Sequence, residues 1–262
     1  MIRFDMLEEQ VDSYKAQFYS AKPFEHIVID GFCDDSKLKE ACRNLTAPVS
    51  GVDKKSGDFV FAKNKFEKSQ FNEVCPEFDI LKQELMSDRF AQWVSKVTGE
   101  NIFIDPDFHG GGLHQGGVGS FLDMHADFNF HPNKRTWFRN VNILLYLNEA
   151  WEPSFGGELT LKDGRIPDGE SFQIAPIFNR AVIMFTREYT LHGYSEINFP
   201  EGSYRRSIAA YGYTEMEKEG DVRTTVWYPE RGGIAKKMLA RYMPKLIRIK
   251  SAIFGSKAKK HK

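Results

Sequence analysis

The sequence predicts a mainly β fold, a sandwich or barrel, with helical segments before and after it in the chain. From Asn101 onward, short segments rich in Ile, Val, Phe, Tyr and Leu alternate with Gly, Pro and Asn, as antiparallel strands and their turns do. No helix-length segment separates them, which disfavours a parallel sheet wound with helices. With 41% hydrophobic and 27% charged residues among 262, the chain suits a soluble globular domain.

The first hundred residues are predicted to support this β region with helices and one strand. Residues 6–20 indicate an amphipathic helix, 26–30 a short strand, and 36–45 a helix with an N-cap among residues 34–36. Residues 50–59 combine Gly, Ser and charges, which indicates a surface loop. Apolar residues at helical spacing over 76–99 predict one long or broken helix.

Seven segments of the β region qualify as strands. We therefore divide the chain into a support region over 1–100, a β domain over 101–215 and a C-terminal extension over 216–262. The predicted strands are 101–104, 122–128, 141–148, 157–161, 171–175, 181–186 and 206–214.

The formal net charge of zero hides an asymmetry between body and tail. Residues 231–262 hold 11 Lys and Arg and no acidic residue, so 1–230 keep 25 basic (36 − 11) and 36 acidic residues, a net charge of −11. Apolar residues at helical spacing predict a tail helix with a break or kink before Pro244. Two interpretations stay open: a helix packed on the body with a solvated basic end, or contact with an anionic membrane or other polyanion. Specific nucleic-acid binding is not expected, because no aromatic–basic motif accompanies the tail.

The sequence indicates a cytoplasmic protein, with a membrane-peripheral position as an option. No apolar run reaches the 18 or so residues of a membrane span, and the N-terminus has no apolar signal core. Cys33, Cys42 and Cys75 show no paired spacing, so neither a disulfide scaffold nor a zinc knuckle is expected.

Three residues of the β region have the character of metal ligands. His125 and Asp127 stand two apart on a predicted strand, so their side chains project to one face. That pair alone also fits an ordinary surface or core histidine. His192 follows an apolar strand 65 residues after Asp127. Two imidazoles and one carboxylate form the facial set of non-haem Fe(II) oxygenases, which leaves metal positions open.

Arg205 follows thirteen residues beyond His192 and is a candidate for binding a carboxylate. A guanidinium offers two parallel donors to a carboxylate, and Ser207 on the same strand face adds a hydroxyl. Alternation along the strand does not decide whether Arg205 or Arg206 points inward, and a pair of surface charges is the alternative.

The order of these motifs resembles the Fe(II)- and 2-oxoglutarate-dependent dioxygenases, in particular the prolyl 4-hydroxylase-like branch. The likeness covers about residues 101–215. The motifs are His125-x-Asp127, Tyr146-Leu147-Asn148, Trp151 followed by Gly156-Gly157-Glu158-Leu159, Pro176 with Asn179-Arg180, His192, and Arg205-Arg206-Ser207-Ile208.

The resemblance implies a double-stranded β-helix, or jelly roll, with the N-terminal helices packed on it and a helical basic tail behind it. It implies that His125, Asp127 and His192 hold Fe(II), and that Arg205 binds the distal carboxylate of 2-oxoglutarate. The hydroxyl of Tyr146 would bind that same carboxylate.

Three further polar residues are cosubstrate candidates by the same resemblance. Asn142 shares the strand face of Tyr146, and Ser207 that of Arg205. Gln115 stands ten residues before His125, where hypoxia-sensing relatives carry a tyrosine. A core tyrosine, and polar groups at a strand end, are the alternatives.

The polar, aromatic insert over 127–140 is a candidate substrate lid through His131, Trp137 and Arg139. Arg139 lies seven residues before Tyr146, where related hydroxylases place a substrate-facing arginine. The alternative is an exposed loop with a packed Trp.

The resemblance implies an enzyme that hydroxylates an unactivated C–H bond with O2, releasing succinate and CO2, with ascorbate as an optional reductant. Asp127 favours hydroxylation, because halogenating relatives lack this carboxylate. Peptidyl proline is the leading substrate, and free amino acids, small metabolites and glycan- or lipid-linked precursors stay open. A jelly-roll module that binds a metal or ligand without catalysis is the alternative of another class.

Overall fold

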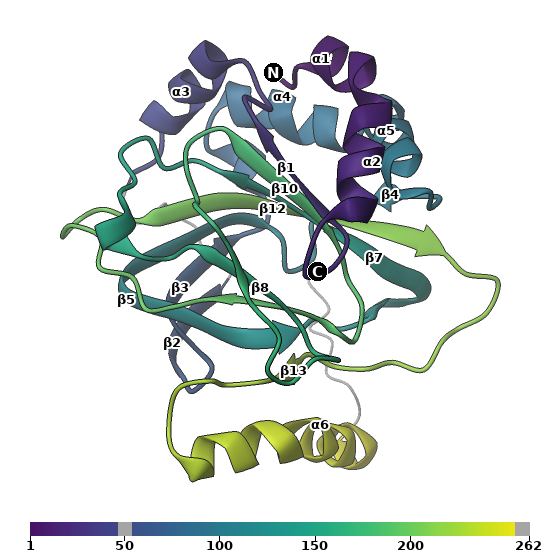
Figure 1. The fold of residues 1–262 in the computed structure, drawn as a ribbon, viewed down its shortest axis with the longest axis vertical. Coiled ribbons are helices and arrows are strands. Elements are labelled where there is room, and N and C mark those ends of the chain that lie inside the picture. The colour runs from purple at the N-terminus through teal and green to yellow at the C-terminus, as the bar shows by residue number, and fades with distance from the viewer. Residues whose placement is uncertain (47–53, 255–262) are drawn as a thin grey trace.

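The chain folds around one antiparallel sheet, described in a computed structural model over residues 1–46 and 54–254 (Figure 1). The main strand order is β1-β10-β7-β12-β5-β11-β8-β9, and β3, β4, β6 and β13 pair with its members. The strands are β1 (His26–Asp30), β2 (Lys54–Phe59), β3 (Ala62–Lys68), β4 (Phe103–Ile104), β5 (Gly112–Ala126), β6 (Phe130–His131), β7 (Lys134–Tyr146), β8 (Leu159–Asp163), β9 (Phe172–Ile174), β10 (Arg180–Phe185), β11 (Thr190–Tyr194), β12 (Arg205–Glu215) and β13 (Val226–Trp227).

Helices lie at two ends of this sheet (Figure 1). Five precede the long strands and gather over one face, whereas the last lies apart from them near β13. The helices are α1 (Phe4–Glu9), α2 (Val11–Ser20), α3 (Asp35–Arg43), α4 (Pro76–Leu85), α5 (Asp88–Thr98) and α6 (Ile234–Phe254), with 3-10 turns η1 (Phe71–Glu73) and η2 (Pro153–Phe155). The predicted jelly-roll class with flanking helices is confirmed, whereas the proposed division at 100 and 215 stays a prediction.

Alternation along β7 separates the two faces of the sheet. Ile143 and Leu145 point to the helices and join the main core. Asn142, Leu144 and Tyr146 point the other way and line a cavity. The face that the sequence assigned to a pocket is therefore the inner face of the roll.

The helix boundaries follow local capping. The predicted helix over 6–20 is two helices, and the one over 76–99 is broken between α4 and α5. Ser87 caps α5, since its Oγ accepts from Phe90 N at 3.2 Å, and Gly99 ends it with φ 69°. Asp34 caps α3 by accepting from Lys37 N.

Two segments predicted as loops belong to strands. Residues 54–59 form β2, which pairs with β3, and β3 extends the sheet beside β5. Both strands are rich in charge, because backbone pairing at a sheet edge does not require an apolar pattern. Residues 47–53 lie outside the described part. The insert over 127–140 contributes β6 and the first half of β7.

The tail helix is continuous and exposes several of its described apolar residues. α6 passes Pro244 as one helix, so of the predicted break or kink the break is wrong, and the kink stays a prediction. It meets the body beside β13, where Ala240 is buried, and the large apolar side chains described as exposed on it are Ile234, Met238, Leu239, Tyr242 and Leu246. The helix thus contacts the body through Ala240 and leaves these described apolar side chains exposed. Among the described helices, none is long and apolar enough to cross a bilayer.

Candidate metal centre and cosubstrate pocket

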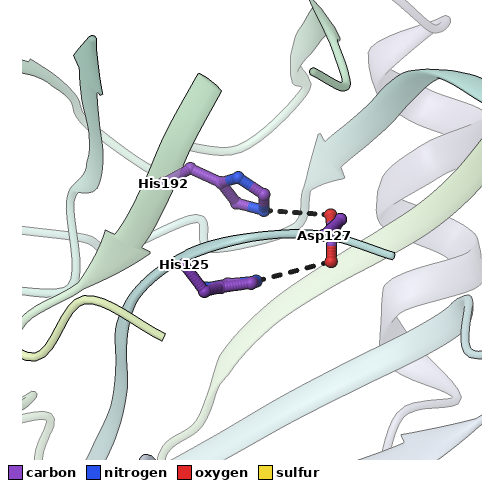
Figure 2. A group of neighbouring side chains, drawn as sticks. All are labelled: His125, Asp127 and His192. Carbon is purple, nitrogen blue, oxygen red and sulfur yellow. Dashed lines mark ion pairs between the residues drawn. The ribbon is translucent and has the colours of Figure 1, made fainter. Parts of the chain in front are cut away.

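Three side chains from two neighbouring strands converge on one point (Figure 2). His125 on β5 pairs with His192 on β11, and Asp127 follows just after β5. Nε2 of His125 lies 3.5 Å from Oδ1 of Asp127, and Nε2 of His192 lies 3.3 Å from Oδ2. The predicted ligand set is thus assembled by strand pairing alone.

The surroundings keep these ligands in the state that a cation requires. Burial opposes the charge of Asp127, but the neighbouring Arg139 and hydrogen bonding with the two histidines hold its pKa well below the usual range. Burial and His125 lower the pKa of His192, which favours the neutral imidazole. Nδ1 of His125 lies 2.9 Å from the carbonyl oxygen of Asp123, which turns Nε2 toward Asp127. The carboxylate of Asp123 instead pairs with Lys236.

The donor set fits Fe(II). Two imidazole nitrogens and one carboxylate suit a non-haem iron centre, and the triad borders a cavity of about 510 Å³. A metal held by these three residues would border this cavity. Its wall is formed by the triad together with Phe59, Ala62, Lys65, Glu67, Gly110, His114, Gln115, Gly116, Leu122, Phe128, Arg139, Asn142, Leu144, Tyr146, Leu159, Gly193, Tyr194, Arg205, Ser207, Tyr211, Thr225 and Trp227.

Arg205 and Tyr146 meet in the same cavity. Nη2 of Arg205 lies 3.4 Å from the hydroxyl of Tyr146, and Nε donates to the carbonyl of Gly157 at 2.6 Å. A Cβ at Gly157, whose φ is 81°, would lie 2.9 Å from Cδ of Arg205, so this glycine makes room for the arginine. Burial raises the pKa of Tyr146, which keeps its hydroxyl protonated as a donor. Arg206 faces the opposite side, toward the carbonyls of Leu45 and Thr46.

Asn142 and Arg139 contact the triad. Arg139 donates from Nη2 to Oδ2 of Asp127 at 2.9 Å and to Oδ1 of Asn142 at 2.8 Å. Asn142 donates from Nδ2 to the same oxygen of Asp127 at 2.8 Å. The structure therefore places Asn142 against the metal carboxylate, whereas the sequence predicted a cosubstrate contact. Arg139 is buried in the cavity wall, stacked 3.5 Å from the Tyr211 ring centroid.

The pairing of β5 with β12 places His114, and not Gln115, directly opposite Ser207. Gln115 lies opposite Arg206, whereas His114 lies opposite Ser207, and paired residues share a face of the sheet. All but Arg206 line the cavity. Gln115, a cosubstrate candidate by the resemblance, and the neighbouring His114 thus both border the cavity.

His131 and Trp137 belong to a separate group of side chains. The Trp137 ring packs 4.6 Å from that of Phe103, and Nε2 of His131 lies 3.7 Å from Oδ2 of Asp105. Neither residue is among the described residues that line the cavity. The structure therefore does not place them as a lid over the site.

Sequence reasoning missed an aromatic wall beside the metal ligands. Trp227 on β13 lies 4.9 Å from the His125 ring and stacks on Phe61 at 5.1 Å, and Phe59 packs against both aromatic rings. The strand β13 spans only two residues, too few for an alternation pattern. The wall forms only when β13 and the β2–β3 hairpin meet β5.

Fold and site together define a non-haem iron oxygenase of the jelly-roll type. Residues 111–213 match the family model described as the 2OG-Fe(II) oxygenase superfamily, so this part of the chain is similar to the members of that superfamily. The protein is accordingly an oxidoreductase whose cofactors are Fe(II) and 2-oxoglutarate.

Solved structures with the same fold include several prolyl hydroxylases. A Trichoplax adhaerens prolyl hydroxylase in complex with a hypoxia inducible factor peptide has a TM-score of 0.59 at 18% identity, covering 80% of this chain and 92% of that one. A Pseudomonas putida prolyl-4-hydroxylase has 0.56 at 16%, covering 78% and 98%. A Phytophthora capsici prolyl 4-hydroxylase has 0.54 at 20%, covering 95% and 76%. Among curated proteins, none matches the chain.

Proposed function

We propose that the protein hydroxylates an unactivated C–H bond in the manner of a prolyl 4-hydroxylase, consuming O2 and releasing succinate and CO2. The observation that carries this proposal is the placement of Arg205 and Tyr146 in the cavity that the triad borders. A dicarboxylate bound at one end by the guanidinium can present its other end to the metal. The intact Asp127 supports hydroxylation.

Each group of the chain has a role in this proposal. His125, Asp127 and His192 would hold Fe(II), which with bound 2-oxoglutarate supplies the oxidising chemistry. Arg205 would hold the distal carboxylate through a charged pair of hydrogen bonds, with Tyr146 as a further donor. Trp227 would form an apolar wall that limits water near the metal.

The proposal is tested by succinate formation. The protein loaded with Fe(II) should convert 2-oxoglutarate to succinate, and His192→Ala should abolish this. Arg206→Ala is the matched control, because Arg206 neighbours Arg205 but faces away from the cavity. Mass spectrometry of proline-containing peptides should show a gain of one oxygen that depends on 2-oxoglutarate. Absence of both 2-oxoglutarate binding and succinate would favour a non-catalytic binding module.

A second substrate class is favoured by an ion pair in the cavity wall. Lys65 and Glu67 on β3 lie with Nζ and Oε1 3.1 Å apart, largely buried, and both line the cavity. A free amino acid carries a carboxylate and an ammonium group that can exchange partners with such a pair, whereas peptidyl proline has no charge. A small zwitterionic substrate is therefore the alternative to a peptide.

Free amino acids and their N-acetyl amides separate these two substrate classes. Both forms share a side chain, but only the free form is charged at both ends. Succinate formation stimulated by a free amino acid and not by its capped form, and reduced in Lys65→Met, would support the zwitterion. Stimulation by capped forms or peptides alone would reject it. A role for ascorbate and a cytoplasmic location stay predictions of the sequence.

A further inference from the structure

The helix α6 presents an apolar strip to the outside of the molecule. Ile234, Met238, Tyr242 and Leu246 recur every four residues, so they follow one side of the helix. Their exposed fractions run from 45% for Tyr242 to 79% for Ile234. Single exposed apolar residues are common on protein surfaces, but a continuous strip along a helix marks an interaction surface.

The body holds α6 by other residues. Ala240 is buried, and Nζ of Lys236 lies 2.7 Å from Oδ2 of Asp123. The same ammonium lies 5.0 Å from the Phe121 ring and 5.9 Å from the Phe61 ring. The helix therefore stays attached without using the apolar strip, which is left available within the described part of the molecule.

Exposed positive charge borders the strip. Lys237 and Arg241 are exposed and stand one helical turn apart, each next in sequence to a residue of the strip. Residues 231–262 carry 11 basic and no acidic residues, whereas 1–230 have a net charge of −11. Attraction to an anionic surface would therefore act at α6, and the acidic body would be repelled.

We propose that α6 is an interfacial helix that binds the surface of an anionic lipid bilayer. An apolar strip bordered by Lys and Arg suits this occupant, because the strip enters the acyl boundary while the cations stay among the headgroups. The strand β13, which carries Trp227, ends seven residues before α6 begins. Binding would thus hold one wall of the metal-site cavity near the bilayer. The proposal does not depend on the reaction catalysed.

Co-sedimentation of the full-length protein with vesicles tests the proposal. We expect binding to phosphatidylcholine vesicles that contain phosphatidylglycerol, and much weaker binding to phosphatidylcholine alone. Changing both Met238 and Tyr242 to Glu should abolish it. Changing Lys237 and Arg241 to Gln should weaken binding to the anionic vesicles roughly 30-fold, from two lost surface charges. Ile166→Glu, at a residue 54% exposed in the turn after β8, is the matched control and should bind as the wild type does.

Three results would overturn the proposal. Equal binding to neutral and anionic vesicles would show that the exposed Lys and Arg side chains do not contribute to binding. Unchanged binding by the Met238→Glu, Tyr242→Glu variant would show that the apolar strip does not contact the bilayer. Near-ultraviolet circular dichroism would first show that this variant is folded. Sedimentation velocity that shows self-association lost in that variant, without vesicle binding, would assign the strip to a second copy of the chain.

Discussion

Arg139 and Asp127 form a buried ion pair in which Nη2 lies 2.9 Å from Oδ2. The same oxygen accepts from Asn142, while Oδ1 faces His125 at 3.5 Å. The guanidinium also lies over the rings of Tyr211 and Phe128, whose centroids are 3.5 and 4.5 Å from its central carbon. The orientation of the metal carboxylate is therefore set by residues that are not themselves metal ligands.

Replacing Arg139 with Gln should weaken metal binding. The substitution removes the charge and the hydrogen bond from Nη2 that orient Asp127, and loss of such a supporting contact typically costs 10- to 100-fold in metal affinity. Titration with Mn(II), followed by electron paramagnetic resonance, measures this without turnover. Arg187→Gln is the control, since Arg187 also stacks on aromatic rings but pairs with Glu100. Equal affinities in both variants would contradict the assigned role.

Arg205→Ala and Arg206→Ala should differ clearly in their affinity for 2-oxoglutarate. A hydrogen bond to a charged group contributes about 1.5–3 kcal/mol, so loss of Arg205 should raise the dissociation constant roughly 10- to 100-fold. Arg206→Ala should leave that constant unchanged. Calorimetry on the Mn(II)-loaded proteins gives both values. A similar loss in the two variants would mean that the effect is structural.

Trp227 should report metal binding by fluorescence. Its indole lies 4.9 Å from the His125 ring, so a paramagnetic ion such as Co(II) held by the triad should quench its emission. Trp227→Phe should remove most of the metal-dependent quenching and leave the Co(II) affinity, measured by calorimetry, close to that of the wild type. Quenching that persists in this variant would place the responsive tryptophan elsewhere.

The His125–Asp127 pair was predictable because the two residues lie two apart, and His192 was predictable because it follows an apolar strand. His125 and Asp127 share a face by strand alternation, and His192 pairs across from His125. The orientation of Arg205 could not be predicted from the sequence, since alternation allowed either Arg205 or Arg206 to point inward. The pairing of Ser207 with Tyr146 in the fold shows that it is Arg205.

Other parts of the site depend on contacts far apart in sequence. The hydrogen bond of Asn142 to Asp127 forms where the chain returns after the β6–β7 hairpin. Trp227 reaches His125 through a strand of two residues. Neither arrangement leaves a periodic signal in the sequence, because each is created by tertiary packing. The amphipathic pattern of α6 was visible, but not which side faces outward.

Asn179 joins the strand-entry turn of β10 to the N-terminal segment and should be important for stability. Its side chain accepts from Cys33 N at 2.8 Å and donates to Cys33 O at 2.7 Å, and it also donates to Asp35. The backbone of Asn179 has φ 59°, a conformation that Asn tolerates better than most residues. The one side chain thus satisfies two buried backbone groups and fits a left-handed turn.

Asn179→Ala should lower the free energy of unfolding by about 3–7 kcal/mol, from two backbone groups left unpaired at roughly 1–3 kcal/mol each and about 1 kcal/mol of backbone strain. Asn179→Gly loses the same hydrogen bonds without the strain, so it should be more stable than Asn179→Ala by about 1 kcal/mol. Urea unfolding measures both losses of stability, provided that the dependence of the free energy of unfolding on urea concentration is the same in each variant. Asn44→Ala, which removes an exposed bond to Glu40 O, should change stability by less than about 0.5 kcal/mol. A stable Asn179→Gly variant would show that the turn conformation, and not the hydrogen bonds to Cys33, determines the need for asparagine.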